Sequence, residues 1–124
     1  MLVNSISDTI FNTQTALTAP GNGSAVQVAE NDLFSTTSYS LLTTVASINT
    51  NVIVRLEGSI DGTDYATIIN NTTYTGNGTF SLNVTGIPMK FVRPVFVSES
   101  GGTAATVRFQ IAAAWSGGTS ILWD

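Results

Sequence analysis

The chain contains neither cysteine nor histidine among its 124 residues. The lack of cysteine excludes disulfides and thiolate metal sites, so the fold must be stabilised by packing and sheet pairing. The lack of histidine removes the usual general base near neutral pH and the commonest zinc ligand. We therefore expect no enzymatic activity, no catalytic residues and no cofactor.

Charged residues are also scarce, at 10% of the chain against roughly 25% in an average soluble domain. The basic residues Arg55, Lys90, Arg93 and Arg108 are scattered singly, and the formal net charge is −4. Such a surface offers no electrostatic footprint for nucleic acid or for an anionic membrane. The chain also has no apolar run long enough to span a bilayer and no secretion signal at its start. We expect a soluble protein that binds neither nucleic acid nor membrane.

Hydrophobic residues, by contrast, make up 43% of the chain, which is enough to bury the core of one domain. We predict a single domain with three parts. Residues 1–20 form an N-terminal arm and a first strand, residues 21–115 form the β-sandwich core, and residues 116–124 form a C-terminal tail.

The segment NVIVRLEGSIDGTDY at residues 51–65 predicts a β-hairpin. Apolar residues alternate with polar ones, so one face is apolar and the other carries Arg55 and Glu57, which we expect to pair. Asp61-Gly62 then marks the turn, because glycine accepts the positive φ that a primed turn requires.

Turn signals recur about every 8–12 residues, the spacing that is typical of sandwiches and barrels. The sequence therefore predicts an all-β fold, an antiparallel β-sandwich of the jelly-roll type with about eight strands. Pro94 indicates an edge or a bulge, because it cannot donate to a ladder, and the only helical candidate is a turn around residues 8–11. Strands are expected at residues 13–18, 25–29, 39–47, 51–57, 66–69, 79–84, 90–97 and 104–115. The predicted core includes Val54, Leu56, Phe80, Leu82, Val107, Phe109 and Ile111.

The densest acidic cluster consists of Glu57, Asp61 and Asp64. Carboxylate oxygens near a turn are the ligands that Ca²⁺ prefers. The spacing matches no EF-hand, however, Asp61 suits the turn itself, and Arg55 is placed to neutralise Glu57. We predict no metal site and no paired-carboxylate active site at this cluster.

Aromatic residues leave two interpretations open. They either form a platform that stacks on sugars or fill the core and rim of the sandwich. The residues concerned are Tyr39, Tyr65, Tyr74, Trp115 and Trp123.

Both ends of the chain carry apolar side chains that a small sandwich would have difficulty covering. Ile121, Leu122 and Trp123 follow a Gly117-Gly118 hinge, so this tail either folds back on its own sheet or docks into a neighbour. We expect Phe11 and these three tail residues to lie at contacts with other subunits or with a larger assembly.

Four segments carry a family resemblance: GNGSAVQV at residues 21–28, LEGSIDGTDY at 56–65, IPMKFVRP at 87–94 and GGTAATV at 101–107. Over about residues 21–111 the chain resembles small β-sandwich virion proteins of tailed bacteriophages, which include capsid decoration (cement) subunits. The tail after Trp115 follows no such pattern.

The resemblance implies a structural protein on the virion surface that binds the major capsid protein and stabilises the shell. A homotrimer would match three-fold points of such a shell. One alternative is a carbohydrate-binding or receptor-binding module of a phage tail or fibre, and another is a subunit of a non-viral surface assembly such as a pilus. The second alternative would need a secretion signal, which we do not see.

Overall fold

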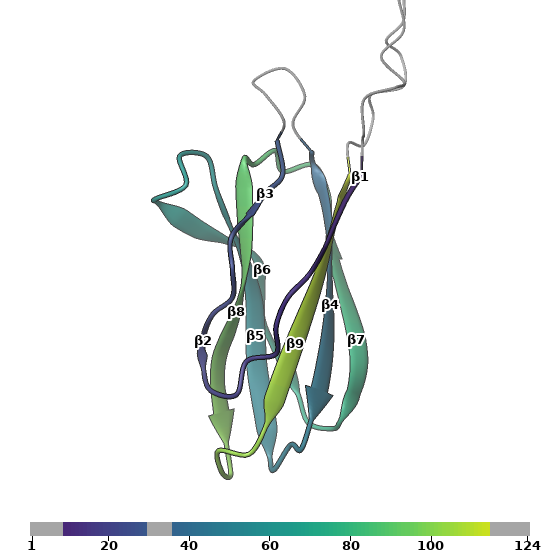
Figure 1. Cartoon of the computed structure of the whole chain (residues 1–124), viewed down its shortest axis with the longest axis vertical. Coiled ribbons are helices and arrows are strands. Elements are labelled where there is room, and N and C mark those ends of the chain that lie inside the picture. The colour runs from purple at the N-terminus through teal and green to yellow at the C-terminus, as the bar shows by residue number, and fades with distance from the viewer. Residues whose placement is uncertain (1–8, 30–35, 115–124) are drawn as a thin grey trace, which may run out of the picture.

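The computed structural model describes residues 9–29 and 36–114 as two antiparallel β-sheets packed face to face (Figure 1). Among these residues there is no helix. The first sheet has the order β1-β9-β4-β7, formed by β1 (Thr9–Thr13), β9 (Thr106–Ala114), β4 (Ser38–Ala46) and β7 (Gly78–Val84). The second sheet has the order β2-β8-β5-β6, formed by β2 (Gly21–Asn22), β8 (Phe91–Ser100), β5 (Asn51–Ser59) and β6 (Tyr65–Tyr74). A fifth strand of this sheet, β3 (Val26–Gln27), also pairs with β8.

The strand order is that of a jelly roll. β2 and β3 lie along the same strand, β8, so together they act as one interrupted edge strand and the sandwich has eight strand positions. Strands that follow one another in the chain then mostly alternate between the two sheets, and every pairing is antiparallel. The prediction of an all-β antiparallel sandwich is confirmed.

The core lies between the two sheets, as the alternation along the strands predicted. Five residues predicted to be in the core, Val54, Leu56, Val107, Phe109 and Ile111, are buried. Their charged neighbours on the same strands point away from the core: Arg108 is exposed and Arg55 is only partly buried. The registers predicted for β5 and β9 are therefore correct.

Phe80 and Leu82 were also predicted to be buried, and that prediction is wrong, because both are only partly buried. The physical reason is topological: β7 is an edge strand, so its inward side chains lie at the rim of the sandwich. Phe80 covers this rim by stacking on Tyr74 of β6, with the ring centroids 4.2 Å apart and the planes 11° from parallel.

The first strand was predicted at residues 13–18, but β1 ends where that range begins. The described part of the helical candidate, residues 9–11, belongs to this strand. Beyond Thr13 the regular pairing ends, although the amide of Gln14 still donates to the carbonyl of Phe109 at 3.0 Å. The side chain of Gln14 bonds to Ser24, which lies between β2 and β3. Its Nε2 donates to the carbonyl of Ser24 at 2.6 Å, and its Oε1 accepts from the amide of Ser24 at 3.0 Å. Leu17 alone returns to β9, as an isolated bridge to Val107.

Pro94 marks a break in the edge pairing. The amide of Gly23 donates to the carbonyl of Pro94 at 2.7 Å, but Pro94 has no N–H to complete the pair. The edge strand is accordingly interrupted between β2 and β3. A Cβ on Gly23 would lie 2.7 Å from Cγ of Pro94 and 2.5 Å from Oε1 of Gln14, so only glycine fits this close approach.

β6 is longer than predicted. Asn70 and Asn71 were expected to end it, but the strand continues to Tyr74. The two asparagines lie where the register with β5 shifts, since Val54 pairs with Thr72 and Leu56 with Ile69. A β-bulge accommodates the extra residue that turn-forming asparagines introduce.

Thr43 provides a test of the packing, because its side chain is fully buried and its Oγ1 has no hydrogen-bond partner. A buried hydroxyl without a partner costs about 1–3 kcal/mol. Thr43→Val keeps the shape and removes the hydroxyl, so we expect it to raise the free energy of unfolding by about 1 kcal/mol in urea titrations.

Thr36→Val is the matched control for Thr43→Val. Thr36 is also buried, but its Oγ1 donates to the carbonyl of Val28 at 2.8 Å. This variant should lower the free energy of unfolding by about 1 kcal/mol. If both variants lowered the free energy of unfolding equally, the hydroxyl of Thr43 would be hydrogen-bonded in solution, contrary to this prediction.

Candidate functional site

The charged residues on the outer face of the second sheet form a structural ion-pair cluster. Glu57, with 8% of its side chain exposed, lies between Arg55 and Arg93 at 2.7 Å and 2.9 Å, one guanidinium on each carboxylate oxygen. Burial acts to raise the pKa of Glu57, but the hydrogen bonds from Arg93 and Arg55 outweigh it and hold the pKa below its ordinary value. Arg93 also lies 3.9 Å above the ring of Tyr65. The predicted pairing of Arg55 with Glu57 is confirmed.

Asp61 belongs to the loop between β5 and β6. Its Oδ1 accepts from the amides of Thr63 and Asp64, both at 2.8 Å, and from the hydroxyl of Ser59 at 3.0 Å. The two backbone hydrogen bonds, that of Asp64 first, lower the pKa of Asp61 to about 2. The loop spans residues 60–64, and Gly62 is the residue within it that has a positive φ. The turn was located correctly, but the expected primed two-residue turn is wrong.

The acidic cluster weighed as a calcium site does not assemble. Glu57 is engaged by two arginines, and Asp61 caps its own loop. In the part of the chain that the structure describes, no group of three or more acidic side chains is placed to hold a metal ion. Over the same residues, no helix is long and apolar enough to cross a membrane.

The three tyrosines lie in three separate environments and form no common platform. Tyr39 is buried, and its hydroxyl donates to the carbonyl of Thr36 at 2.6 Å and accepts from the amide of Met89 at 3.0 Å. Tyr65 lies under Arg93, and Tyr74 stacks on Phe80. Trp115 and Trp123 fall outside the described residues.

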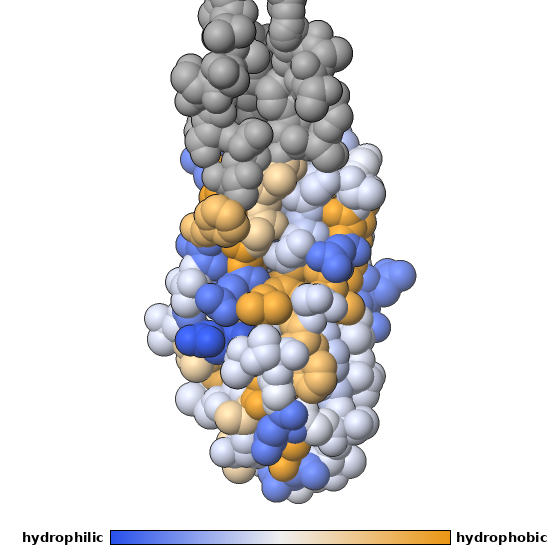
Figure 2. Space-filling view, turned by 90° about the vertical axis from the view of Figure 1, so that its right-hand side faces the viewer, coloured by the Kyte–Doolittle hydropathy of each residue, from blue (hydrophilic) through white to orange (hydrophobic). Residues whose placement is uncertain are grey.

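The outer face of the first sheet has a different character. Arg108 is the one charged residue in its four strands as described. Figure 2 looks at the right-hand side of Figure 1, where β7 and β4 lie, and shows hydrophobic residues among pale ones of intermediate hydropathy and several hydrophilic ones. The outward positions are mainly Ser, Thr and Ala, and they include Ser38, Ser40, Leu42, Thr44, Ala46, Thr79, Ser81, Asn83, Arg108, Gln110, Ala112 and Ala114.

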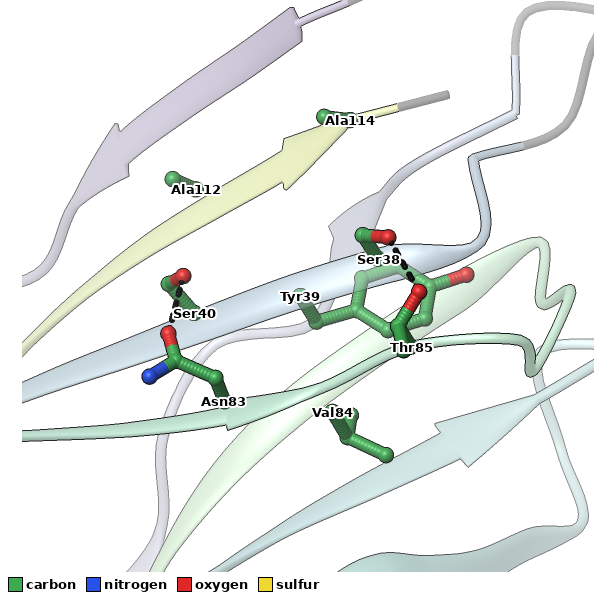
Figure 3. Close-up of a pocket in the computed structure, with 8 residues that line it drawn as sticks. All are labelled: Ser38, Tyr39, Ser40, Asn83, Val84, Thr85, Ala112 and Ala114. Atoms are coloured by element: carbon green, nitrogen blue, oxygen red, sulfur yellow. Dashed lines mark hydrogen bonds between the residues drawn. The ribbon is translucent and has the colours of Figure 1, made fainter. Parts of the chain in front are cut away.

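This face carries a shallow hollow of about 440 Å³ between β4, β7 and β9 (Figure 3). Its polar side chains are paired across the strands, because Ser38 and Thr85 share a hydrogen bond of 2.7 Å and Ser40 donates to Asn83 at 2.6 Å. No lining residue is charged: they are Ser38, Tyr39, Ser40, Asn83, Val84, Thr85, Ala112 and Ala114.

A second hollow of about 260 Å³ adjoins the first, and Ser40 and Ala112 line both. Phe11, 78% exposed, and Leu42, 36% exposed, are among its lining residues. We call the two hollows together the sheet-face groove. Of the four predicted contact residues, Phe11 is therefore exposed and lines the groove, whereas Ile121, Leu122 and Trp123 lie outside the described residues.

The groove is not apparent from the sequence alone. The available signal was a run of small residues at alternate positions, such as Ser38 and Ser40 or Ala112 and Ala114. These positions become one surface only when β4 and β9, which are far apart in the sequence, pair in register.

The fold has a solved counterpart. The chain is similar to the crystal structure of the SPBc2 prophage-derived protein YomS, with a TM-score of 0.53 and 14% sequence identity over 92% of this chain and 100% of that one. This likeness is one of fold. No protein-family model matches the chain, and no curated protein matches its sequence.

Proposed function

We propose that this chain is a structural protein of a bacteriophage particle and that it decorates the capsid, binding the shell and stabilising it. The observation that carries the proposal is the outer face of the first sheet, which is almost without charge and has Phe11 standing 78% exposed at its edge. The sandwich fold, shared with a prophage-derived protein, supports the phage context.

A decoration protein needs a stable fold and a surface that binds the capsid, and it does not need to catalyse a reaction. Exposed aromatic side chains such as Phe are enriched at protein interfaces, whose centres contain few charged residues. Burying Phe11 would contribute roughly 1.5–3 kcal/mol per contact, and symmetry multiplies such contacts over a shell. The proposed partner is the major capsid protein, with a homotrimer as the arrangement that fits three-fold points.

The receptor-binding alternative requires a surface that selects a glycan. Stacking of sugars would need aromatic rings gathered beside polar loops, but the tyrosines are separated, and Tyr39 is buried. No described feature favours this alternative over decoration.

Phe11→Ser tests the proposal. With undecorated capsids of the phage that encodes the chain, we expect the variant to bind at least about tenfold more weakly than the wild type, because the loss of one buried aromatic side chain is worth at least 1.4 kcal/mol. The measurement is a co-sedimentation titration with the capsids at fixed concentration.

Ile60→Ser is the matched control, since Ile60 is a large hydrophobic residue that is 69% exposed in the loop between β5 and β6. Its affinity for capsids should equal that of the wild type. Failure of the wild type itself to sediment with the capsids would overturn the proposal, and equal losses in both variants would remove Phe11 from the contact.

A further inference from the structure

We propose that two free copies of this chain pair through the outer faces of their first sheets, with Phe11 of each copy seated in the first hollow of the other. The inference goes beyond capsid binding, because it concerns the protein in the absence of a shell. It rests on the register of the four strands, on the charge of the face and on its hydrogen bonds.

Phe11 and the first hollow lie in one row across the sheet. Phe11 of β1 is opposite Ala112 of β9. Ala112 is opposite Ser40 of β4, and Ser40 is opposite Asn83 of β7. Figure 3 shows these last three residues in line across their strands, where they line the first hollow. An exposed aromatic ring therefore stands at one end of the row, and the hollow lies toward the other end.

This arrangement is self-complementary. A two-fold axis parallel to the strands, between the two faces, turns the row end for end and places β1 of each copy over β7 of the other. Phe11 of one chain then meets the hollow beside Asn83 of its partner, and the same contact is made twice, as in an isologous interface. The hollow of about 440 Å³ has room for a phenyl ring.

The charge of the face favours a second copy over a charged partner. Two copies with a formal net charge of −4 each repel one another, but the described strands of the first sheet contain no acidic residue. Their one charged residue, Arg108, is four residues from Ala112 along β9, about 13 Å from the row. An uncharged face is best matched by another uncharged face, which this chain itself supplies.

Covering the face requires little desolvation, because many of its polar side chains already bond to one another. The pairs are Ser38 with Thr85 at 2.7 Å, Ser40 with Asn83 at 2.6 Å, Thr44 with Thr79 at 3.1 Å and Gln110 with Thr13 at 3.2 Å. These groups keep their hydrogen bonds when water leaves the surface, so the penalty for an unsatisfied donor or acceptor is avoided.

The face is large enough for a specific contact. Its four strands cover roughly 500 Å² of flat area, from a strand spacing of about 4.8 Å and a rise of about 3.4 Å per residue. Two such faces bury about 1,000 Å², the lower limit for a specific contact between proteins. We therefore expect a weak, reversible pair, which separates to free the same face for the capsid.

Sedimentation velocity of the full chain without capsids tests the pairing. At up to about 0.1 mM, a range suited to small interfaces, the wild type should approach the mass of two chains. Phe11→Ser removes the ring and Ala112→Arg places a charge in the hollow, so each should weaken pairing at least about tenfold. Ile60→Ser, the matched change at an exposed position on the second sheet, should leave pairing unchanged.

A wild type that stays monomeric over this range would overturn the inference without affecting capsid binding. Pairing that survives Phe11→Ser would overturn it as well. The two Arg108 side chains would approach each other across the axis, so added salt should strengthen the pair by screening their repulsion, and weakening by salt would contradict the arrangement. A pair that forms but does not bind capsids would instead overturn the proposed function.

Disulfide trapping tests the register, because the chain has no cysteine. Phe11→Cys is introduced in one chain and Asn83→Cys in another. Mild oxidation of their mixture should cross-link the two chains at least about tenfold faster than oxidation of either variant alone, because only the mixed pair holds two thiols at high local concentration. The mixture of Phe11→Cys with Ile60→Cys is the control and should be equally slow. Equal rates in all four samples would refute the two-fold arrangement.

Discussion

Replacing Phe109 with alanine is expected to lower the free energy of unfolding by about 3–5 kcal/mol. Phe109 is fully buried in β9, a strand with a neighbour on each side, so little of the cavity can close by relaxation. With stabilities of small domains near 5–15 kcal/mol, this one change should shift the urea midpoint far toward zero.

Arg108→Ala is the control for Phe109→Ala, since Arg108 is the exposed neighbour on the opposite face of the same strand. Its effect should lie within about 0.5 kcal/mol. A one-residue error in register would exchange the two results, so a large loss in Arg108→Ala and a small one in Phe109→Ala would contradict the fold.

Glu57→Gln should cost about 2 kcal/mol at neutral pH. Glutamine keeps the size of the side chain but removes the negative charge that faces Arg55 and Arg93, whose side chains are 31% and 28% exposed. Hydrogen bonds to charged groups contribute about 1.5–3 kcal/mol, and leaving one partner of a partly buried pair unmatched is costly. Chemical denaturation at pH 7 measures this loss.

The difference in stability between the wild type and Glu57→Gln should depend on pH, in a direction that follows from the pKa of Glu57. Because the folded pKa of Glu57 is lowered from its ordinary value of 4.5, the ionised group stabilises the fold above that value, and the stability is lost as the pH falls through the folded pKa. The wild type and the variant should therefore converge in stability as the pH is lowered from 7 toward 3. Parallel curves over this range would show that the ion pairs contribute nothing.

Local alternation was sufficient to predict the orientation of side chains in the long strands. In β5 and β9 the inward residues, such as Val54 and Phe109, were identified correctly because a period of two is a property of the strand itself. The turn at Asp61 and Gly62 was likewise located from local chemistry, because the side chain of Asp61 caps its own loop.

Features that depend on topology could not be predicted in this way. Whether Phe80 is buried or lies at the rim depends on β7 being an edge strand, which is decided by its pairing with β4. The position of β1 depends on its pairing with β9, a strand about 100 residues away in the sequence. The groove has the same origin, since it joins small residues from strands that are distant in the sequence.

Imaging of decorated particles tests the central claim most directly. Purified protein mixed with undecorated capsids is examined by cryo-electron microscopy with symmetry averaging. Decoration predicts added density of sandwich size at symmetry-related positions of the shell, saturating with protein concentration, with the first sheet and Phe11 facing the capsid or a neighbouring subunit. Bare capsids at saturating protein, or density confined to tails and fibres, would contradict it.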